Sequence, residues 1–422
     1  MERFRLDNGL RVVLAPDRSA PVIAVAVFYD VGIRSEPPGR TGFAHLFEHL
    51  MFQGSAHLEK LAHFRHVQGA GGTFNGSTHL DYTDYYETLP AGALERALFL
   101  EADRMRGPIL TEANLRNQVD VVKEEIRVNV LNRPYGGFPW LKLPPVMFDT
   151  FGNAHDGYGS FDDLEAATID DASGFFETYY AAGNAVLTVA GDVDPDLARI
   201  LIEKHFGDVP PRPAPPRPAL AEPDLTGERR ESYVDPLAPA PAVAAAWRVP
   251  DPVAERAAFL PYVVLAEVLT DGDASRLVER MVLRDRSVTS VGGYLGFMGE
   301  PYAVRDPTAL VLQARLPAGR AVDPVLATVD EELDRLATDG LAPGELGRTQ
   351  ARMATHLLRD TDAVLGRSLT IAGLELVHGD PALVNDLPRL VGEVTAGQVE
   401  QAAATLRADR RASVEVVPGG GS

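Results

Sequence analysis

Apolar residues near the start of the chain occur in short runs rich in β-branched side chains, a pattern typical of β-strands. Two such runs, at residues 11–14 and 22–28, are separated by a turn-like Pro-Asp-Arg-Ser segment. A third run, at residues 184–191, is apolar almost throughout and predicts a buried strand. Helical spacing of apolar residues is found at residues 42–52, 94–106, 112–131, 171–180 and 194–205. This order of strands and helices predicts sheets with helices packed against them.

A proline-rich stretch at residues 210–223 interrupts this pattern. Such a segment is stiff and cannot join the interior of a sheet, so we expect a connector between domains. Strands and helices are predicted again after it, at residues 242–247, 254–269, 275–281, 309–316 and 412–417. The second half therefore echoes the order of elements in the first, although the two halves share few identical residues.

The composition narrows the chemistry that this chain can perform. Its 422 residues are enough for two or three domains, and 45% of them are hydrophobic, as in folded proteins. The absence of cysteine excludes disulfides, thiolate metal sites and a cysteine nucleophile. With 40 Lys and Arg against 60 Asp and Glu, the formal net charge is −20, which argues against nucleic acid as a ligand. Any bound metal must therefore be held by His, Asp or Glu.

The sequence pattern does not predict attachment to a membrane. Residues 1–16 carry scattered charges and lack the apolar core of a secretory signal. The longest apolar run, residues 21–29, is far shorter than the roughly 20 residues that span a bilayer. We therefore expect a cytoplasmic protein.

Six of the ten histidines lie between residues 45 and 79, and two of them belong to an otherwise apolar helical segment. Within residues 43–52, the titratable side chains are His45, Glu48 and His49, and their spacing places all three on one helix face, within about 100°. Buried groups of this kind need partners, and a divalent metal can supply one. Two imidazoles one turn apart can bind one zinc ion while the carboxylate between them holds its water, as in the His-x-x-Glu-His motif. The alternative is a pair of core histidines with ordinary hydrogen-bond partners.

A catalytic zinc ion needs a third protein ligand, and the helix predicted at residues 112–131 offers two adjacent glutamates. Its apolar residues form one stripe, made of Leu115, Val119, Val122, Ile126 and Val130. In projection, Glu124 lies about 160° from the centre of that stripe, toward solvent, whereas Glu125 lies about 100° from it, on the flank that carries Gln118. A ligand has to face the protein, so we select Glu125 and interpret Glu124 as a solvated charge.

These residues resemble the M16 metallopeptidases, the family of pitrilysin, insulin-degrading enzyme and mitochondrial processing peptidase. The resemblance rests on His-Leu-Phe-Glu-His at residues 45–49 and on Val-Val-Lys-Glu-Glu-Ile at residues 121–126. It also rests on the glycine-rich segment at residues 71–78 and on the strand at 184–192, whereas the second half matches only in its order of elements and around residues 275–277. The length resembles that of the shorter members, whose catalytic unit is a pair of chains.

The resemblance implies an α+β fold of two structurally similar lobes, each a mainly antiparallel sheet flanked by helices. The catalytic, zinc-binding lobe would comprise residues 1–209, followed by a linker at 210–223 and by a second lobe at 224–422 that lacks the zinc motif.

The resemblance also implies roles for individual residues. His45, His49 and Glu125 would bind Zn²⁺, and Glu48 would be the general base, in agreement with the chemistry of such a site.

Asn75 and Gly76 would, by resemblance, line the edge that receives an extended peptide substrate as an additional strand. The family usually has alanine where this chain has Gly76. The alternative for this segment is a plain β-turn that leads into a hairpin. The remaining histidines of the region are assigned to the surface or to supporting positions; they are His57, His63, His66 and His79.

The chain departs from the family pattern at two places. Family members commonly have an acidic residue seven positions before the third ligand, where this chain has Gln118, so a charge behind that ligand is missing. Active members also carry an Arg and a Tyr, seven positions apart, that bind substrate and steady the oxyanion. In this chain the aligned positions hold Val282 and Thr289. We therefore expect a second M16-like subunit that supplies the Arg and Tyr, in a heterodimer, with a homodimer as the alternative.

The combined expectation is a zinc metalloendopeptidase that hydrolyses unfolded peptides or small proteins, as the zinc-bearing subunit of a two-chain clamshell. The alternative is a non-catalytic structural subunit of the same fold, like the respiratory core proteins. A zinc hydrolase that does not cleave peptides is a third possibility.

Overall fold

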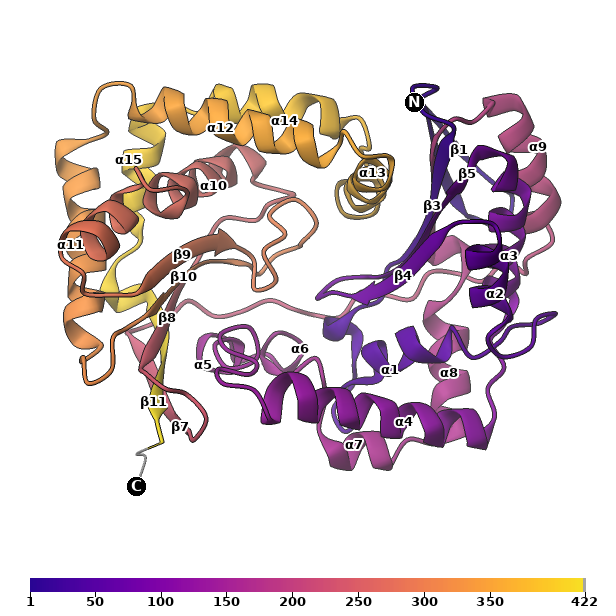
Figure 1. Ribbon diagram of the computed structural model, residues 1–422, viewed down its shortest axis with the longest axis horizontal. Coiled ribbons are helices and arrows are strands. Elements are labelled where there is room, and N and C mark those ends of the chain that lie inside the picture. The colour runs from indigo at the N-terminus through magenta and orange to yellow at the C-terminus, as the bar shows by residue number, and fades with distance from the viewer. Residues whose placement is uncertain (420–422) are drawn as a thin grey trace. The chain divides into compact units, whose positions relative to one another are not determined.

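Two β-sheets organise residues 1–419, the part of the chain that the computed structural model describes (Figure 1). The first sheet has six strands in the order β1-β2-β6-β3-β5-β4, and the second has five in the order β7-β11-β8-β10-β9. The strands of the first sheet are β1 (Glu2–Arg5), β2 (Arg11–Pro16), β3 (Val22–Tyr29), β4 (Thr73–Thr78), β5 (Thr83–Pro90) and β6 (Ala185–Gly191). Those of the second are β7 (Arg229–Asp235), β8 (Ala242–Arg248), β9 (Ser290–Leu295), β10 (Ala309–Arg315) and β11 (Arg411–Pro418).

The two sheets share one topology. Each contains one parallel pair, β2 with β6 in the first sheet and β7 with β11 in the second. All other neighbours are antiparallel, and five strands follow one another in the same order in both sheets, with β1 as an extra edge strand in the first. The prediction of two similar, mainly antiparallel α+β lobes is therefore confirmed.

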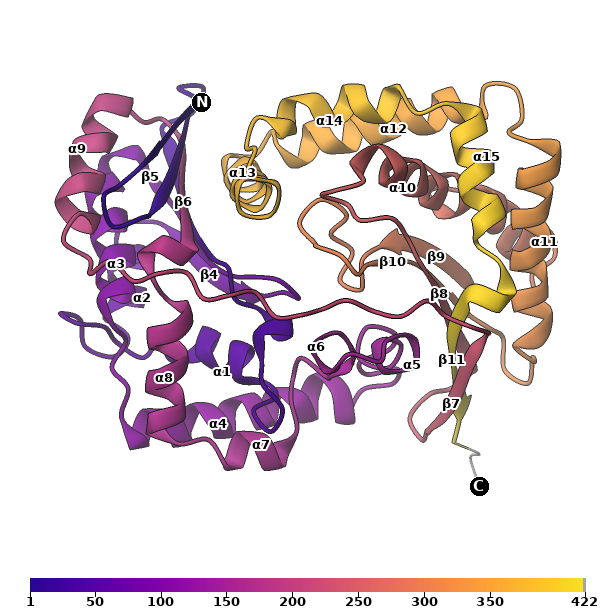
Figure 2. The same cartoon turned by 180° about the vertical axis from the view of Figure 1, so that it is seen from behind.

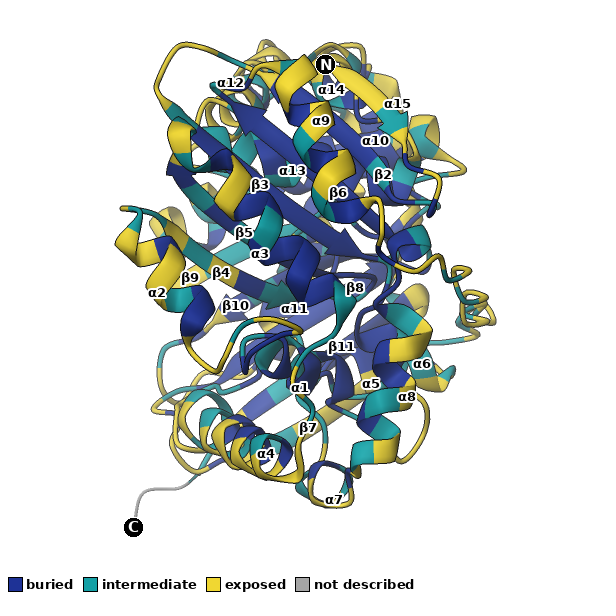
Figure 3. Cartoon of the chain, turned by 90° about the vertical axis from the view of Figure 1, so that its right-hand side faces the viewer, coloured by how far each residue is buried: buried dark blue, intermediate teal, exposed yellow. Residues whose placement is uncertain are grey.

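Helices cover both faces of the first sheet. The helices of the same unit are α1 (Phe43–Leu50), α2 (Ala62–Gly69), α3 (Leu94–Arg106), α7 (Phe161–Glu165), α8 (Ile169–Tyr179), α9 (Pro195–Phe206) and α13 (Val364–His378). Helix α3 packs on β3 and β5, and α13 packs on β2, β3 and β6. Ile371 of α13 packs in one cluster with Val13, Ala15 and Ala190, of which Ala15 and Ala190 are register partners on β2 and β6. Because the sheet is covered on both faces, β3 and β6 are buried almost throughout (Figure 3).

The second sheet has its own helices and its own core. These helices are α5 (Pro144–Met147), α6 (Phe151–Ala154), α10 (Arg256–Thr270), α11 (Asp323–Asp339) and α15 (Ala396–Thr405). Buried residues of β8, β10, α10 and α11 belong to one hydrophobic cluster, which includes Trp247. Three further helices continue from one unit of the chain into the other; they are α4 (Glu112–Ile126), α12 (Glu345–Asp360) and α14 (Leu383–Gly392).

Each sheet belongs to a separate compact unit that draws on several parts of the chain. The first unit comprises residues 1–124, 156–218 and 358–385, and the second comprises 125–155, 219–357 and the residues from 386 onward. Residues 358–385, which the sequence-based division places in the second lobe, lie in the first unit because the apolar side chains of α13 cover the first sheet. The predicted lobe boundaries at residues 209 and 224 stay a prediction. The proline-rich residues 210–226, along which the chain passes from the first unit to the second at residue 218, form neither helix nor strand (Figure 2).

Most predicted helices have the expected limits, but two end differently. The helix predicted at 112–131 ends as α4 at Ile126 and continues as a π-helix, Arg127–Leu131. The segment predicted at 275–281 is likewise a π-helix, Val278–Arg284. Periodicity cannot separate these wider turns from α-helix over so few residues. Among residues 1–419, no helix combines the length and the apolar character needed to cross a bilayer.

Candidate metal centre

Helix α1 is held in place at its first turn by a buried carboxylate and a glycine. Glu36 Oε2 accepts a hydrogen bond from the Gly42 N–H at 2.8 Å, and Glu36 Oε1 accepts one from the Ala44 N–H at 2.7 Å. These bonds satisfy backbone donors that a helix leaves open at its N-terminus. Gly42 has a φ of +83°, and a Cβ there would lie 2.4 Å from the carbonyl oxygen of Tyr158. The position therefore requires glycine.

The apolar side of α1 is buried, and its polar residues share the other side. The ring of Phe47 packs on that of Phe175, with the centroids 4.9 Å apart. His45, Glu48 and His49 are half-buried, whereas the apolar residues of the helix are buried. This arrangement agrees with the single polar face expected from the spacing of the three residues.

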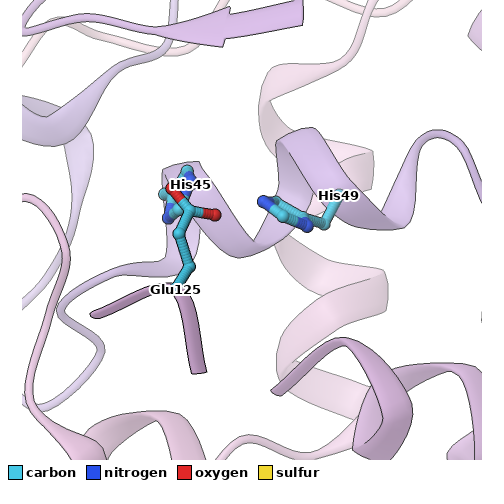
Figure 4. Close-up of side chains that lie close together, drawn as sticks. All are labelled: His45, His49 and Glu125. Carbon is cyan, nitrogen blue, oxygen red and sulfur yellow. The ribbon is translucent and has the colours of Figure 1, made fainter. Parts of the chain in front are cut away.

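His45, His49 and Glu125 come together (Figure 4). One ligand atom from each, a ring nitrogen or a carboxylate oxygen, lies within 4.8 Å of the others. The two imidazole rings are 4.8 Å apart between centroids and nearly perpendicular, at 87°. Helix α4 presents Glu125 to this group, while the neighbouring Glu124 is exposed.

The donor set fits a zinc ion. Two imidazole nitrogens and one carboxylate oxygen are ligands that zinc binds at about 2.0–2.2 Å, which leaves a fourth position for water. Atoms bound to one tetrahedral zinc lie about 3.4 Å apart. Side-chain shifts of about 1 Å bring three atoms that lie within 4.8 Å of one another to that separation.

Glu48 is oriented by a residue that sequence reasoning missed. Thr78 Oγ1 donates a hydrogen bond of 2.7 Å to Glu48 Oε2. Thr78 follows Gly76 by two positions on β4, so both residues face the same side of the strand. A Cβ at Gly76 would lie 3.2 Å from Glu48 Cγ, a tight contact. Alternate residues of a strand face the same side, so Thr78 could have been identified from the sequence once Gly76 was placed beside the His-x-x-Glu-His motif.

Asn75 lies on the opposite face of β4 and is exposed. It is the register partner of Tyr86 across the hairpin. Burial raises the pKa of Tyr86, with a further contribution from the Asp84 carboxylate. β4 is the end strand of its sheet and is bonded on one side to β5.

Gln118 is buried on α4, and its amide donates a hydrogen bond of 2.9 Å to Asn117 Oδ1.

In the second unit, Val282 packs against the hydrophobic cluster, and the Thr289 hydroxyl donates a hydrogen bond to the carbonyl oxygen of Arg315 at 3.1 Å. Positions 282 and 289 therefore carry neither the guanidinium of an Arg nor the phenol of a Tyr.

The second unit holds a different cluster on the helices that occupy equivalent places. α10 follows β8 as α1 follows β3, and α12 takes the place of α4 in the order of elements. There, ligand atoms of Glu267, Asp271 and His356 lie within 4.8 Å of one another. Arg352 forms an ion pair with Asp271, and burial together with Asp271 raises the pKa of Glu267 to about 7. This cluster is partly neutralised and has a single imidazole, so it does not reproduce the arrangement on α1.

Two family models match the chain. Residues 11–134 match the one described as "Insulinase (Peptidase family M16)", and residues 166–353 match the one described as "Peptidase M16 inactive domain". The second of these stretches contains no His-x-x-Glu-His sequence.

Several curated proteins are similar in sequence. Zinc protease PqqE of Helicobacter pylori is 34% identical over 210 residues, which cover 49% of this chain and 46% of that protein. An uncharacterized zinc protease of Streptomyces coelicolor is 26% identical over 438 residues, covering 99% of this chain and 89% of the relative. The mitochondrial-processing peptidase subunit beta of Homo sapiens is 28% identical over 203 residues, 48% of this chain and 41% of the relative. The matched stretch thus spans about half the length of the first and third relatives.

Solved structures share the fold. The crystal structure of a protease from Helicobacter pylori has a TM-score of 0.91 at 23% identity, and the alignment covers 99% of both chains. At this identity the likeness concerns the fold, which extends over both units.

Proposed function

Because this chain belongs to the M16 family of metallopeptidases, we propose that it is a zinc metalloendopeptidase that hydrolyses unfolded peptides or small proteins. The observation that carries the proposal is the convergence of His45, His49 and Glu125 within 4.8 Å, with Glu48 on the same face of α1. Two histidines, one glutamate and an adjacent carboxylate are one of the sets that hydrolytic zinc sites use. The cytoplasmic location stays a prediction.

In this proposal His45, His49 and Glu125 hold the metal, and Glu48 moves the proton. A zinc ion in such a site supplies Lewis acidity and lowers the pKa of water toward neutrality. Glu48 accepts the proton of the attacking water at Oε1 and passes it to the leaving amine. Thr78 holds the other oxygen, Oε2, at 2.7 Å, which keeps the carboxylate in one orientation during both transfers.

The substrate, in this proposal, binds as an extended strand. β4 ends the sheet, so its outer edge can pair with an incoming peptide backbone. Gly76 faces Glu48 and Asn75 faces the other side, so both line the strand that receives the peptide. Since pairing of this kind needs an extended backbone, the substrates are unfolded peptides and not folded proteins.

A second subunit completes the site in this proposal. The positions at which active family members carry Arg and Tyr are Val282 and Thr289, and their side chains are occupied by the core and by the backbone of the second unit. A relative named as a subunit of a peptidase supports an arrangement of two chains. We propose a heterodimer whose other M16-like chain supplies the two side chains, with a homodimer as the alternative.

The test uses a quenched fluorescent peptide with this chain alone and with M16-like chains that carry the Arg and Tyr. Cleavage that needs the mixture supports the pair. Strong cleavage by this chain alone would favour the homodimer and contradict the assignment of Val282 and Thr289. His49→Ala should abolish cleavage and release zinc, while His356→Ala, in the second unit, serves as a matched histidine control.

The alternative function is a non-catalytic structural subunit of the same fold. The description "inactive domain" for residues 166–353 is what favours it. Measuring the zinc content distinguishes the peptidase from the structural subunit. If the purified chain contains no zinc and takes up none when zinc is added, it is a structural subunit. Zinc without peptide cleavage, in the presence of every candidate partner, indicates a different zinc hydrolase.

A further inference from the structure

A second group of metal-binding side chains is buried in the first unit. Glu87 lies at the centre of β5, between Val25 of β3 and Phe74 of β4, and is fully buried. Glu101 of α3 is also fully buried, and His63 of α2 is 8% exposed. Ligand atoms of these three acidic and imidazole side chains lie within 4.8 Å of one another. This group shares no residue with the set on α1 and α4.

Four buried polar atoms of this group form no hydrogen bond within the part of the chain that the structure describes. Both carboxylate oxygens of Glu87, Oε2 of Glu101 and Nε2 of His63 are buried without a hydrogen bond among residues 1–419. Buried polar atoms in folded proteins nearly always have a partner, and those that lack one commonly bind a water molecule or an ion. Acceptor atoms from three side chains that lie within 4.8 Å of one another are better satisfied by a cation than by water, which brings only two donors.

The separations agree with a metal. His63 Nε2 and Glu87 Oε2 are 3.3 Å apart, and they do not form a hydrogen bond. Two atoms bound to one tetrahedral zinc ion lie about 3.4 Å apart. We propose that His63, Glu87 and Glu101 form a second, structural site for a divalent transition metal such as Zn²⁺, behind the β4–β5 hairpin.

The surroundings of His63 favour the neutral imidazole, which is the form that binds a metal. Burial, followed by the charge of Arg104, lowers the pKa of His63 to about 2, so its imidazole stays neutral. The ring of His63 lies against those of Phe52 and Phe74, at 5.8 and 5.5 Å between centroids, both nearly perpendicular. An apolar wall of this kind excludes water and strengthens metal–ligand bonds.

Arg104 sets the charge of the site. It forms an ion pair with Oε1 of Glu101, which leaves Oε2 for the metal, and its guanidinium lies over the ring of Tyr85 at 4.4 Å. One guanidinium cannot neutralise two buried carboxylates, so a further positive charge is required. The competing occupant is a proton on Glu87, because burial and Glu101 raise the pKa of this carboxyl. A metal ion and a proton therefore compete for this carboxylate.

The experiment counts zinc ions per folded chain after stripping and reloading at pH 7.5, in four proteins. The wild type should bind about two zinc ions, Glu87→Gln and His49→Ala about one each, and His356→Ala, the exposed control, about two. Glu87→Gln keeps the shape of the side chain and removes the charge. An unchanged zinc content in Glu87→Gln, or a single zinc ion in the wild type, would overturn the second site and assign a shared proton to Glu87. Loss of the second zinc in His356→Ala would place it in the second unit instead.

A measurement on the unaltered protein keeps the proposal testable if Glu87→Gln fails to fold. Crystals of the wild type loaded with zinc, measured across the zinc absorption edge, should show an anomalous peak between His63, Glu87 and Glu101. Density without such a peak would refute the site. This outcome does not depend on the proposed peptidase activity. That activity is tested separately, by His49→Ala and by an anomalous peak between His45, His49 and Glu125.

Discussion

Replacing Thr78 by valine should slow peptide cleavage without weakening substrate binding. Valine keeps the shape of threonine and removes the donor of the 2.7 Å hydrogen bond to Glu48 Oε2. That bond orients the carboxylate to which we assign the proton transfers. Its loss therefore acts on the chemical step, and the strand that receives the peptide stays intact.

The size of the effect follows from the strength of the bond. A hydrogen bond to a charged group contributes about 1.5–3 kcal/mol when both partners are protected from solvent. Thr78 and Glu48 are half-buried, so water replaces part of the lost bond. We therefore take a value just below this range, about 1.4 kcal/mol, which corresponds to a tenfold lower kcat. KM should be unchanged, because the bond is not made to the substrate.

The assay compares wild type, Thr78→Val and Thr78→Ser by cleavage of a quenched fluorescent peptide, with the partner subunit present and zinc content measured for each protein. Serine keeps the hydroxyl and should retain most of the wild-type kcat. The reasoning is refuted if Thr78→Val keeps the wild-type kcat, or if Thr78→Ser is as slow as Thr78→Val. A loss of zinc in Thr78→Val would point to the metal ligands and not to the base.

Two further predictions concern stability, and urea unfolding measures both. Gly42→Ala should lower the free energy of unfolding by about 3 kcal/mol, because φ is +83° and the new Cβ would lie 2.4 Å from the Tyr158 carbonyl oxygen. Gly39→Ala, at φ +81° with open space around it, should cost only about 1 kcal/mol, and equal losses would contradict the steric argument. The hydrogen bond from Arg367 lowers the pKa of Asp17 to about 2, so this carboxylate stabilises the fold above the unfolded pKa of 3.8. The advantage of wild type over Asp17→Asn should be constant above about pH 5 and shrink as pH falls toward about 2; an advantage that grows in acid would contradict it.

The sequence predicted those parts of the fold and site that depend on local pattern. The helix predicted at 94–106 has the limits of α3, and the helix predicted at 194–205 corresponds to α9 within one residue at each end. The helical projection that separated Glu125 from Glu124 selected the residue that the structure brings to His45 and His49. Spacing within one helix is sufficient for such statements, because the side chains concerned share a rigid element.

Features that depend on packing between segments far apart in the sequence could not be predicted from the sequence. Glu36 caps α1 from outside the helix, and Thr78 reaches Glu48 across 30 positions. The sequence pattern assigns His63 to the surface or to a supporting position, and the structure buries it against Glu87 of another element. A glutamate at an inward position of a strand is a signal that can be read from a sequence, but its partners are known only once the helices are placed over the sheet.

The most direct test of the peptidase account is Glu48→Gln, studied with the partner subunit present. We predict the same zinc content as in the wild type and a loss of peptide cleavage by at least about a thousandfold, because glutamine cannot accept the proton of the attacking water. Cleavage at the wild-type rate, with zinc retained, would contradict the central claim that Glu48 is the base of a zinc-dependent hydrolysis.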